Sequence, residues 1–191
     1  MICRGFLRHL LGRYLGARPA DLIFAYGPNG KPALSGRHAS IDLSFNLSHS
    51  EDLALFSITR GYRLGVDVER KRPLNDLEGL TRQILSQAEQ AELRSVPAAM
   101  AAEVFWTCWT AKEAYVKARG EGLSISPERI AVAFKPTEAP RLVSVDGDLD
   151  EAARWSLLTF APSSDYLAAV VVEGQVRRVT RLEWFDATGT H

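Results

Sequence analysis

The sequence lacks most of the features that would assign it to a specialised class of protein. Its two cysteines, Cys3 and Cys108, do not have the spacing of metal ligands, so neither a disulfide framework nor a cysteine-based zinc site is expected. No apolar run approaches the roughly 20 residues of a membrane-spanning helix. Basic and acidic residues both number 23, which excludes a globally basic nucleic-acid binder. We therefore expect a cytoplasmic protein that binds neither membranes nor nucleic acid.

Acidic residues are also absent before Asp21, whereas arginines recur through an apolar pattern in this stretch. Such a pattern is found in transit peptides and in helices that lie on membrane surfaces. However, the pattern runs into Gly16 and Pro19, which are typical of a helix end. We therefore favour an amphipathic helix over residues 4–16 that belongs to the folded domain.

The length of 191 residues suits one domain or two small halves, and 46% hydrophobic residues are enough for a sizeable core. The patterns predict a helix and strands, then helices, then a long helix and strands again. This order indicates an α+β fold in which two halves pack together, residues 1–95 and residues 96–191. Strands are predicted at 22–26, 41–47, 53–59, 64–69, 129–134, 141–145, 154–160, 166–172 and 179–185, and helices at 77–85, 86–95 and from residue 98 onward. Ser86 followed by Glu89 matches a capping box at the start of the helix at 86–95. Turn signals at 146–148 and 173–174 predict hairpins between the strands on either side of them.

One helical stretch, residues 105–122, places charge where apolar side chains are expected. At about 100° per residue, Phe105, Trp109 and Val116 share a stripe, and Lys112 falls inside it. Glu113 lies at the edge of the stripe, with Lys117 one turn beyond. Charged groups rarely become buried unless they are paired or bind a ligand. The alternative is a Glu113–Lys117 pair that only supports the helix.

A second informative site is the predicted strand at 64–69. Its alternation places Asp67 and Glu69 on one face, about 7 Å apart. Paired carboxylates of this kind suit a hard cation such as Mg²⁺. The alternative is a pair of surface acids that the neighbouring arginines and lysine balance.

Two polar segments are less specific. Lys31 follows the glycine-rich turn Gly27-Pro28-Asn29-Gly30, where a lysine can reach a phosphate but is more often only solvated. Ser48-His49-Ser50 is expected to close the strand at 41–47. This cluster could hold a nucleophile and a base, donate to an anion or form a polar turn, although the adjacent serine and histidine are poorly placed for a hydrolase triad.

Taken together, three segments resemble the 4′-phosphopantetheinyl transferases of the surfactin-synthetase-activating (Sfp) type. They are Asn46-Leu47-Ser48-His49-Ser50, then Gly65-Val66-Asp67-Val68-Glu69, then Trp109-Thr110-Ala111-Lys112-Glu113-Ala114-Tyr115-Val116-Lys117 followed by Gly120-Glu121-Gly122-Leu123. The resemblance implies two similar α+β halves in pseudo-twofold arrangement, the first half shortened at its N-terminus. It also implies a monomer whose affinity for coenzyme A is weakened by that shortening.

The resemblance further implies a reaction. The phosphopantetheine arm of coenzyme A moves to a serine of an acyl, aryl or peptidyl carrier protein, and adenosine 3′,5′-bisphosphate leaves, with Mg²⁺ as cofactor. The residues that match the family's positions divide into metal ligands (Asp67, Glu69, Glu113), a general base (Glu113, with Lys117 as its catalytic partner) and coenzyme A contacts (Arg8, Lys31, Ser48, His49, Lys112, Lys117).

Two other functions would use the same residues. A Mg²⁺-dependent phosphohydrolase needs the acids but no protein acceptor, and a binding module would hold the charges only as surface pairs.

For a carrier protein, a basic landing surface is expected near the helices at 77–95. It would be formed by Arg70, Lys71, Arg72, Arg82 and Arg94, unless these residues are merely solvated.

Overall fold

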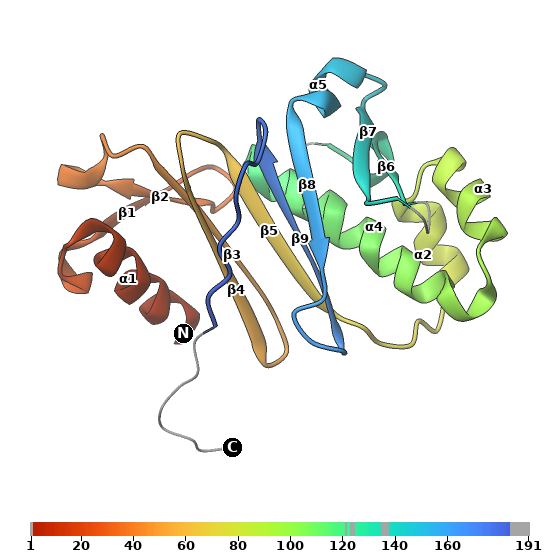
Figure 1. Ribbon diagram of the computed structural model, residues 1–191, viewed down its shortest axis with the longest axis horizontal. Coiled ribbons are helices and arrows are strands. Elements are labelled where there is room, and N and C mark those ends of the chain that lie inside the picture. Colours follow the sequence, from red (N-terminus) through yellow and green to blue (C-terminus); the bar gives the residue numbers. More distant parts are fainter. Residues whose placement is uncertain (1, 121, 123–124, 135–137, 184–191) are drawn as a thin grey trace.

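The computed structural model describes residues 2–120, 122, 125–134 and 138–183 (Figure 1). The fold is α+β, as predicted, and its β-strands pair antiparallel. In chain order, the helices and strands are α1 (Ile2–Leu15), β1 (Ile23–Tyr26), β2 (Pro32–Ser35), β3 (Leu43–Ser50), β4 (Leu53–Arg60), β5 (Leu64–Arg70), α2 (Leu77–Ile84), α3 (Gln87–Ser95), α4 (Ala98–Arg119), β6 (Ile130–Ala133), β7 (Arg141–Val145), α5 (Leu149–Ala153), β8 (Trp155–Phe160) and β9 (Tyr166–Glu173).

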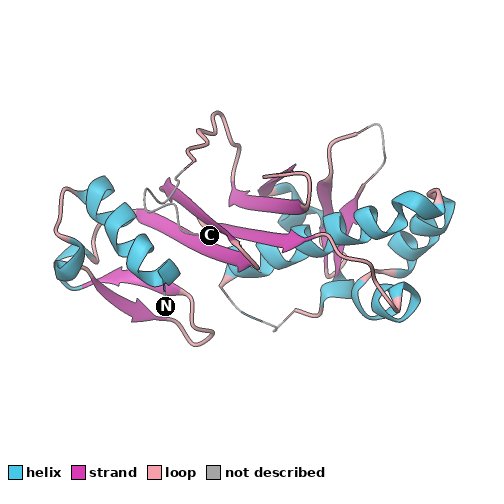
Figure 2. Ribbon diagram, turned by 90° about the horizontal axis from the view of Figure 1, so that it is seen from below, coloured by secondary structure: helices cyan, strands magenta, loops and turns pink. Residues whose placement is uncertain are grey.

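The strands form one three-stranded sheet, β5-β9-β8, and three pairs, β1-β2, β3-β4 and β6-β7. Helix α1 and the β1-β2 pair lie at one end of the molecule, α2 and α3 lie at the other, and α4 runs along the central sheet (Figures 1 and 2). None of the described helices is long and apolar enough to span a bilayer. Strand β5 pairs with β9, so it joins the C-terminal sheet, and a boundary at residue 95 stays a prediction.

Several predicted elements need correction. Strand β3 extends to Ser50, so the polar segment 46–50 is strand and not a closing turn. Helix α5 follows the turn at 146–148, and β7 pairs with β6, so no hairpin forms between β7 and β8. No strand forms over 179–183, and residues 184–185 of that prediction lie outside the described part. Strand β2 and helix α5 were not predicted, because Pro32 at the start of β2 indicates a loop and the five residues of α5 are too few to show a helical period.

Polar side chains stay in strand β3 because they take hydrogen bonds from β5. The backbone N–H groups of Val66, Val68 and Arg70 donate to side-chain oxygens of β3 at 2.9, 3.3 and 3.1 Å. The acceptors are Asn46, Ser48 and Ser50, whose period of two places all three on the side of β3 that faces β5. These bonds join the β3-β4 pair to the three-stranded sheet and satisfy an edge of β5.

One face of β5 lies against α4 at a distance that only glycine permits. A Cβ atom built on Gly65 would lie 2.1 Å from the carbonyl oxygen of Ala114 and 2.3 Å from the backbone nitrogen of Ala118. Both contacts are to backbone, which cannot rotate away. Small residues on α4 complete the close packing, since Ala111, Ala114 and Ala118 are almost fully buried.

We therefore expect Gly65→Ala to lower the free energy of unfolding by about 3 kcal/mol or more, because the added methyl group forces α4 away from β5. Urea denaturation followed by circular dichroism measures this change. Gly5→Ala in α1 is the matched control, because a Cβ there meets nothing within 4 Å, and alanine stabilises a helix by up to about 1 kcal/mol. Equal stability of the Gly65→Ala variant and the unmodified chain would contradict the close-approach argument.

Candidate active site

A cleft of about 970 Å³ lies between α1, the β1-β2 turn, β3 and the C-terminal half of α4. Five of the residues predicted from sequence line it together: Arg8, Lys31, His49, Glu113 and Lys117. They come from four elements that are far apart in the sequence. The volume is in the range of sites for small molecules and cofactors, and most of these side chains are cationic, which suits an anionic ligand.

Asp67 lies beneath this cleft and is 3% exposed. Its Oδ1 accepts hydrogen bonds from Lys117 Nζ at 2.6 Å and from Ser48 Oγ at 2.9 Å. Lys117 Nζ also donates to Ser48 Oγ at 3.0 Å, so the three groups form a closed triangle. The second oxygen of Asp67, Oδ2, is buried and has no hydrogen-bond partner among the described residues.

Two further carboxylates belong to the same site. Glu69 accepts from Ser50 Oγ at 3.2 Å and from the indole N–H of Trp109 at 3.3 Å. Burial raises the pKa of Glu113, and the charge of Asp67 raises it further, whereas Lys117 opposes the shift. The negative charge of Glu69 also raises this pKa, so the three acids act on one another electrostatically.

The three carboxylates have the chemical properties of a cation-binding site. All the donors are oxygen, the like charges repel one another, and the buried Oδ2 of Asp67 needs a partner. Within the described ranges, no three histidine, cysteine, aspartate or glutamate side chains already form a cluster that could hold a metal ion. The donors present therefore fit Mg²⁺ in type, while the ammonium group of Lys117 neutralises Asp67.

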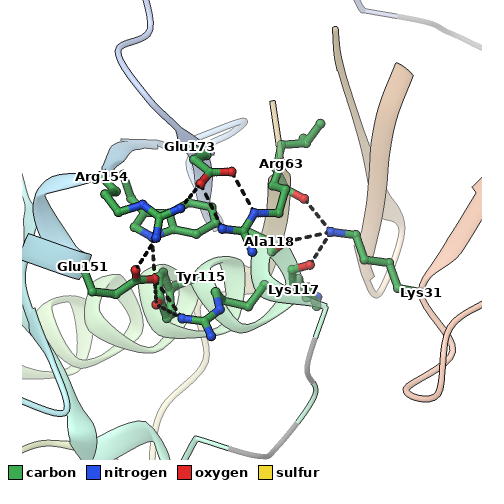
Figure 3. A network of polar contacts seen from close by, with 11 residues as sticks. Lys31, Arg63, Tyr115, Lys117, Ala118, Glu151, Arg154 and Glu173 are labelled. Atoms are coloured by element: carbon green, nitrogen blue, oxygen red, sulfur yellow. Dashed lines mark hydrogen bonds and ion pairs between the residues drawn. The ribbon is translucent and has the colours of Figure 1, made fainter. Parts of the chain in front are cut away.

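Lys31 connects the β1-β2 turn to the end of α4 (Figure 3). Its Nζ donates to the carbonyl oxygens of Leu64, Lys117 and Ala118 at 2.9, 2.7 and 3.0 Å. Burial lowers the pKa of Lys31 to about 8, and the charge of Arg63 contributes to this shift. The carbonyls at a helix C-terminus lack intrahelical partners, so Lys31 caps α4 as well as lining the cleft.

Arg8 and His49 both line the cleft, but their side chains differ in how far the protein itself holds them. Arg8 Nη1 donates to the carbonyls of Pro19 and Leu22, and its guanidinium lies 4.8 Å from the centre of the Phe24 ring. His49 is exposed at the cleft, because the alternation of β3 turns it away from Ser48 and Ser50. Arg8 is therefore held in place by its own half of the chain, and His49 is open to a ligand.

Two residues predicted to contact coenzyme A do not line the cleft. Lys112 is completely buried and does not line the cleft, so the prediction that it contacts coenzyme A is wrong. Its Nζ donates to Glu89 Oε2 at 2.7 Å and to the carbonyls of Ile84 and Pro127 at 2.8 and 3.1 Å. Ser48 faces Asp67 and Lys117 and is 6% exposed, and its contact with the nucleotide phosphate stays a prediction.

Glu89 explains why a lysine can occupy the apolar stripe. Its Oε2 also accepts from the Ser86 backbone at 2.7 Å, completing a predicted capping box, and its Oε1 accepts from the Val132 backbone at 2.8 Å. Burial lowers the pKa of Lys112, and the charge of Glu89 opposes this shift. The pair therefore joins α3, α4 and β6 in the interior.

We expect Lys112→Met to lower the free energy of unfolding by about 3–5 kcal/mol, because Glu89 would become a buried charge without its partner. The double variant Lys112→Met, Glu89→Gln should regain part of this loss, since it removes that charge. Urea denaturation measures both values, with Lys71→Met as a control for a partly exposed lysine. A Lys112→Met variant with unchanged stability but without coenzyme A binding would restore the ligand role.

A second polar network lies beside the C-terminal part of α4 (Figure 3). Glu173 accepts from Arg63 Nε at 2.7 Å and pairs with Arg154, which also contacts Glu151. The hydrogen bond from Arg63 is the main reason that the pKa of Glu173 falls from 4.5 to about 2. A carboxylate whose pKa is depressed by folding stabilises the folded state above its unfolded pKa.

This contribution should be complete above pH 4.5 and disappear as the pH falls toward 2. We therefore expect Glu173→Gln to be less stable than the unmodified chain at pH 7 and to lose less stability between pH 4.5 and 2. Urea midpoints measured across this range test the expectation. Glu78→Gln, at a side chain that is 84% exposed, should retain the pH dependence of the unmodified chain. Parallel curves for Glu173→Gln and the unmodified chain would contradict it.

Ser50, Trp109 and Phe24 also belong to the site, although none of them was among the predicted site residues. Ser50 and Trp109 contact Glu69, and Phe24 lines the cleft beneath Arg8. The period of two in residues 46–50 is the signal that could have identified Ser50, because it places this serine beside Ser48. Within the predicted Gly120–Leu123 segment, Glu121 and Leu123 lie outside the described residues.

Comparisons with known proteins agree with these motifs. The family model of the 4′-phosphopantetheinyl transferase superfamily matches residues 63–171. The 4′-phosphopantetheinyl transferase HetI of Nostoc sp. is 42% identical over 171 residues, which cover 90% of this chain and 69% of HetI. AcpT of Salmonella typhimurium, also a 4′-phosphopantetheinyl transferase, is 38% identical over 113 residues, which cover 59% of this chain and 56% of AcpT.

Among solved structures, a holo-(acyl-carrier-protein) synthase from Bacillus anthracis in complex with CoA is 22% identical. The match has a TM-score of 0.46 and covers 59% of this chain and 96% of the synthase chain. The chain thus spans about two thirds of HetI and about half of AcpT. From the family match and the HetI identity, the chain belongs to the 4′-phosphopantetheinyl transferase superfamily.

Proposed function

We propose that this chain transfers the 4′-phosphopantetheine group of coenzyme A to a serine of a carrier protein, releasing adenosine 3′,5′-bisphosphate. The observation that carries the proposal is one cleft that combines cationic side chains with Glu113, above the buried Asp67, in a chain of this superfamily. Transfer from a pyrophosphate needs the charge on the bridging and leaving oxygens to be neutralised, and this cleft provides that charge.

Different residues of the cleft would bind different parts of coenzyme A. Arg8, Lys31 and His49 line the N-terminal side and suit the phosphates of coenzyme A. Lys117 lies on the opposite wall, 30% exposed, where its ammonium can pair with the pyrophosphate as well as with Asp67. This division places the reacting phosphorus near Glu113 and the nucleotide toward α1.

The acids would hold the metal and accept the proton. Asp67, Glu69 and Glu113 are the proposed Mg²⁺ ligands, and when bound the ion would neutralise the pyrophosphate oxygens. Glu113 is half-buried and lines the cleft, so its carboxylate is open to a bound ligand and to a hydroxyl that enters the cleft. We assign it as the general base for the carrier serine, directly or through a water.

The finer assignments rest on sequence motifs. We propose the Sfp-type arrangement of two halves, and we propose that the chain acts as a monomer in the cytoplasm without membrane or nucleic-acid partners.

For the acyl, aryl or peptidyl carrier we propose a landing surface beside Glu69, where Arg70, Lys71 and Arg72 follow directly in the chain. Lys71 pairs loosely with Glu103 at 3.7 Å, and Arg72 lies 5.8 Å from the Trp106 ring centre. Arg82 and Arg94 complete the proposed surface on α2 and α3.

The loading of an apo-carrier tests the function. With coenzyme A and Mg²⁺, we expect the mass of an apo-carrier to increase by one phosphopantetheine, measured by intact-protein mass spectrometry. Several acyl, aryl and peptidyl apo-carriers should be compared, so that failure of one carrier is not mistaken for lack of activity. Free bisphosphate with unmodified carriers would instead support a phosphohydrolase. No metal-dependent heat on titration with coenzyme A would support a binding module.

Glu113→Gln should reduce the transfer rate by about 10²–10⁴-fold, because it removes the base and one metal ligand while leaving the shape of the side chain. Its urea denaturation midpoint should not fall, since Glu113 is a half-buried acid among like charges. Glu92→Gln in α3, away from the cleft, is the control and should retain full activity. Turnover by Glu113→Gln at the rate of the control would remove Glu113 from both roles.

A further inference from the structure

Two serines of β3 make the same pair of hydrogen bonds one after the other. Ser48 Oγ accepts from the Val68 backbone at 3.3 Å and donates to Asp67 Oδ1 at 2.9 Å. Ser50 Oγ accepts from the Arg70 backbone at 3.1 Å and donates to Glu69 Oε2 at 3.2 Å. Each hydroxyl therefore bridges a carboxylate and the N–H of the residue that follows it.

The repetition has a physical consequence. A hydroxyl carries one proton, and accepting a backbone N–H leaves that proton to be donated elsewhere. In both serines the available acceptor is the carboxylate, so the backbone of β5 fixes the direction in which each hydroxyl donates. The spacing of two residues on β3 matches the spacing of two between Asp67 and Glu69 on β5.

Glu69 is fixed from a second direction. The indole N–H of Trp109 on α4 donates to its Oε1 at 3.3 Å, while Ser50 on β3 donates to its Oε2. Each oxygen is thus held by a different element, one by α4 and the other by β3. A partly buried carboxylate with both oxygens oriented in this way loses little further freedom when it takes up a cation.

We propose that Ser50 is a positioning residue for the metal site, and that it orients Glu69 as Ser48 orients Asp67. The inference rests on the proposed Mg²⁺-dependent transfer and assigns a role to a serine that would otherwise be a strand residue beside His49. Groups that orient metal ligands typically contribute about 10–100-fold to metal affinity or activity. Ser50 is not among the residues that line the cleft, and its hydroxyl donates to Glu69, so it would act through Glu69.

The test compares three variants of the full chain. Ser50→Ala removes the hydroxyl, Ser50→Thr keeps it, and Ser57→Ala removes a matched hydroxyl on β4 that donates only to the Asn46 carbonyl at 3.4 Å. Mn²⁺ serves as the metal probe, and electron paramagnetic resonance measures free Mn²⁺ in the presence of coenzyme A. The Mg²⁺ dependence of carrier loading and the urea midpoint are measured on the same samples.

We expect Ser50→Ala to weaken Mn²⁺ binding about 10-fold and to raise the half-saturating Mg²⁺ concentration to match. Ser50→Thr and Ser57→Ala should stay within about twofold of the unmodified chain, and all urea midpoints should remain similar. Metal affinity that is unchanged in Ser50→Ala would overturn the proposal, as would equal losses in Ser50→Ala and Ser57→Ala. If the unmodified chain loads no carrier and binds no Mn²⁺, the proposed function itself fails.

Discussion

The site depends on how closely α4 can lie against β5. At Gly65 the strand and helix backbones leave no room for a Cβ atom, and this contact sets the distance between Asp67 on β5 and Lys117 on α4. Their side chains then meet at 2.6 Å, although 50 residues separate them in the chain. The same packing brings Glu113 close enough to Asp67 for the negative charge to raise its pKa. A site that needs opposed charges on two elements thus depends on one glycine.

The edge of β5 that faces β3 is held by hydrogen bonds of another kind. There β3 supplies side-chain oxygens to backbone N–H groups, so the two sheets meet without a continuous backbone ladder. Because the acceptors are side chains, they can make a second bond, and Ser48 and Ser50 use it to hold the acids. Strand β5 is therefore positioned by β3 along one edge and by α4 on one face, and both elements also supply residues to the site.

Some features of the fold and of the site could be predicted from the sequence. Alternation placed Asp67 and Glu69 on one face, the capping box at Ser86 was correct, and β7 was predicted at its observed bounds. The end of β3 was not predicted, because a run of polar residues resembles a turn until the edge of β5 is present to bind them. Long-range pairing decides such cases, and local periodicity carries no information about it.

Lys112 and Lys117 show, within one helix, that local periodicity does not reveal the long-range partners of a side chain. Both are lysines in a stretch of strong helical periodicity, and the wheel correctly placed Lys112 among apolar side chains. What that position means depends on Glu89, which comes from another helix and completes a buried pair. Lys117 meets Asp67 at the cleft instead and keeps 30% of its side chain exposed. A charge in an apolar stripe therefore predicts a partner, and only the packing of the other elements decides whether that partner is a ligand or the protein itself.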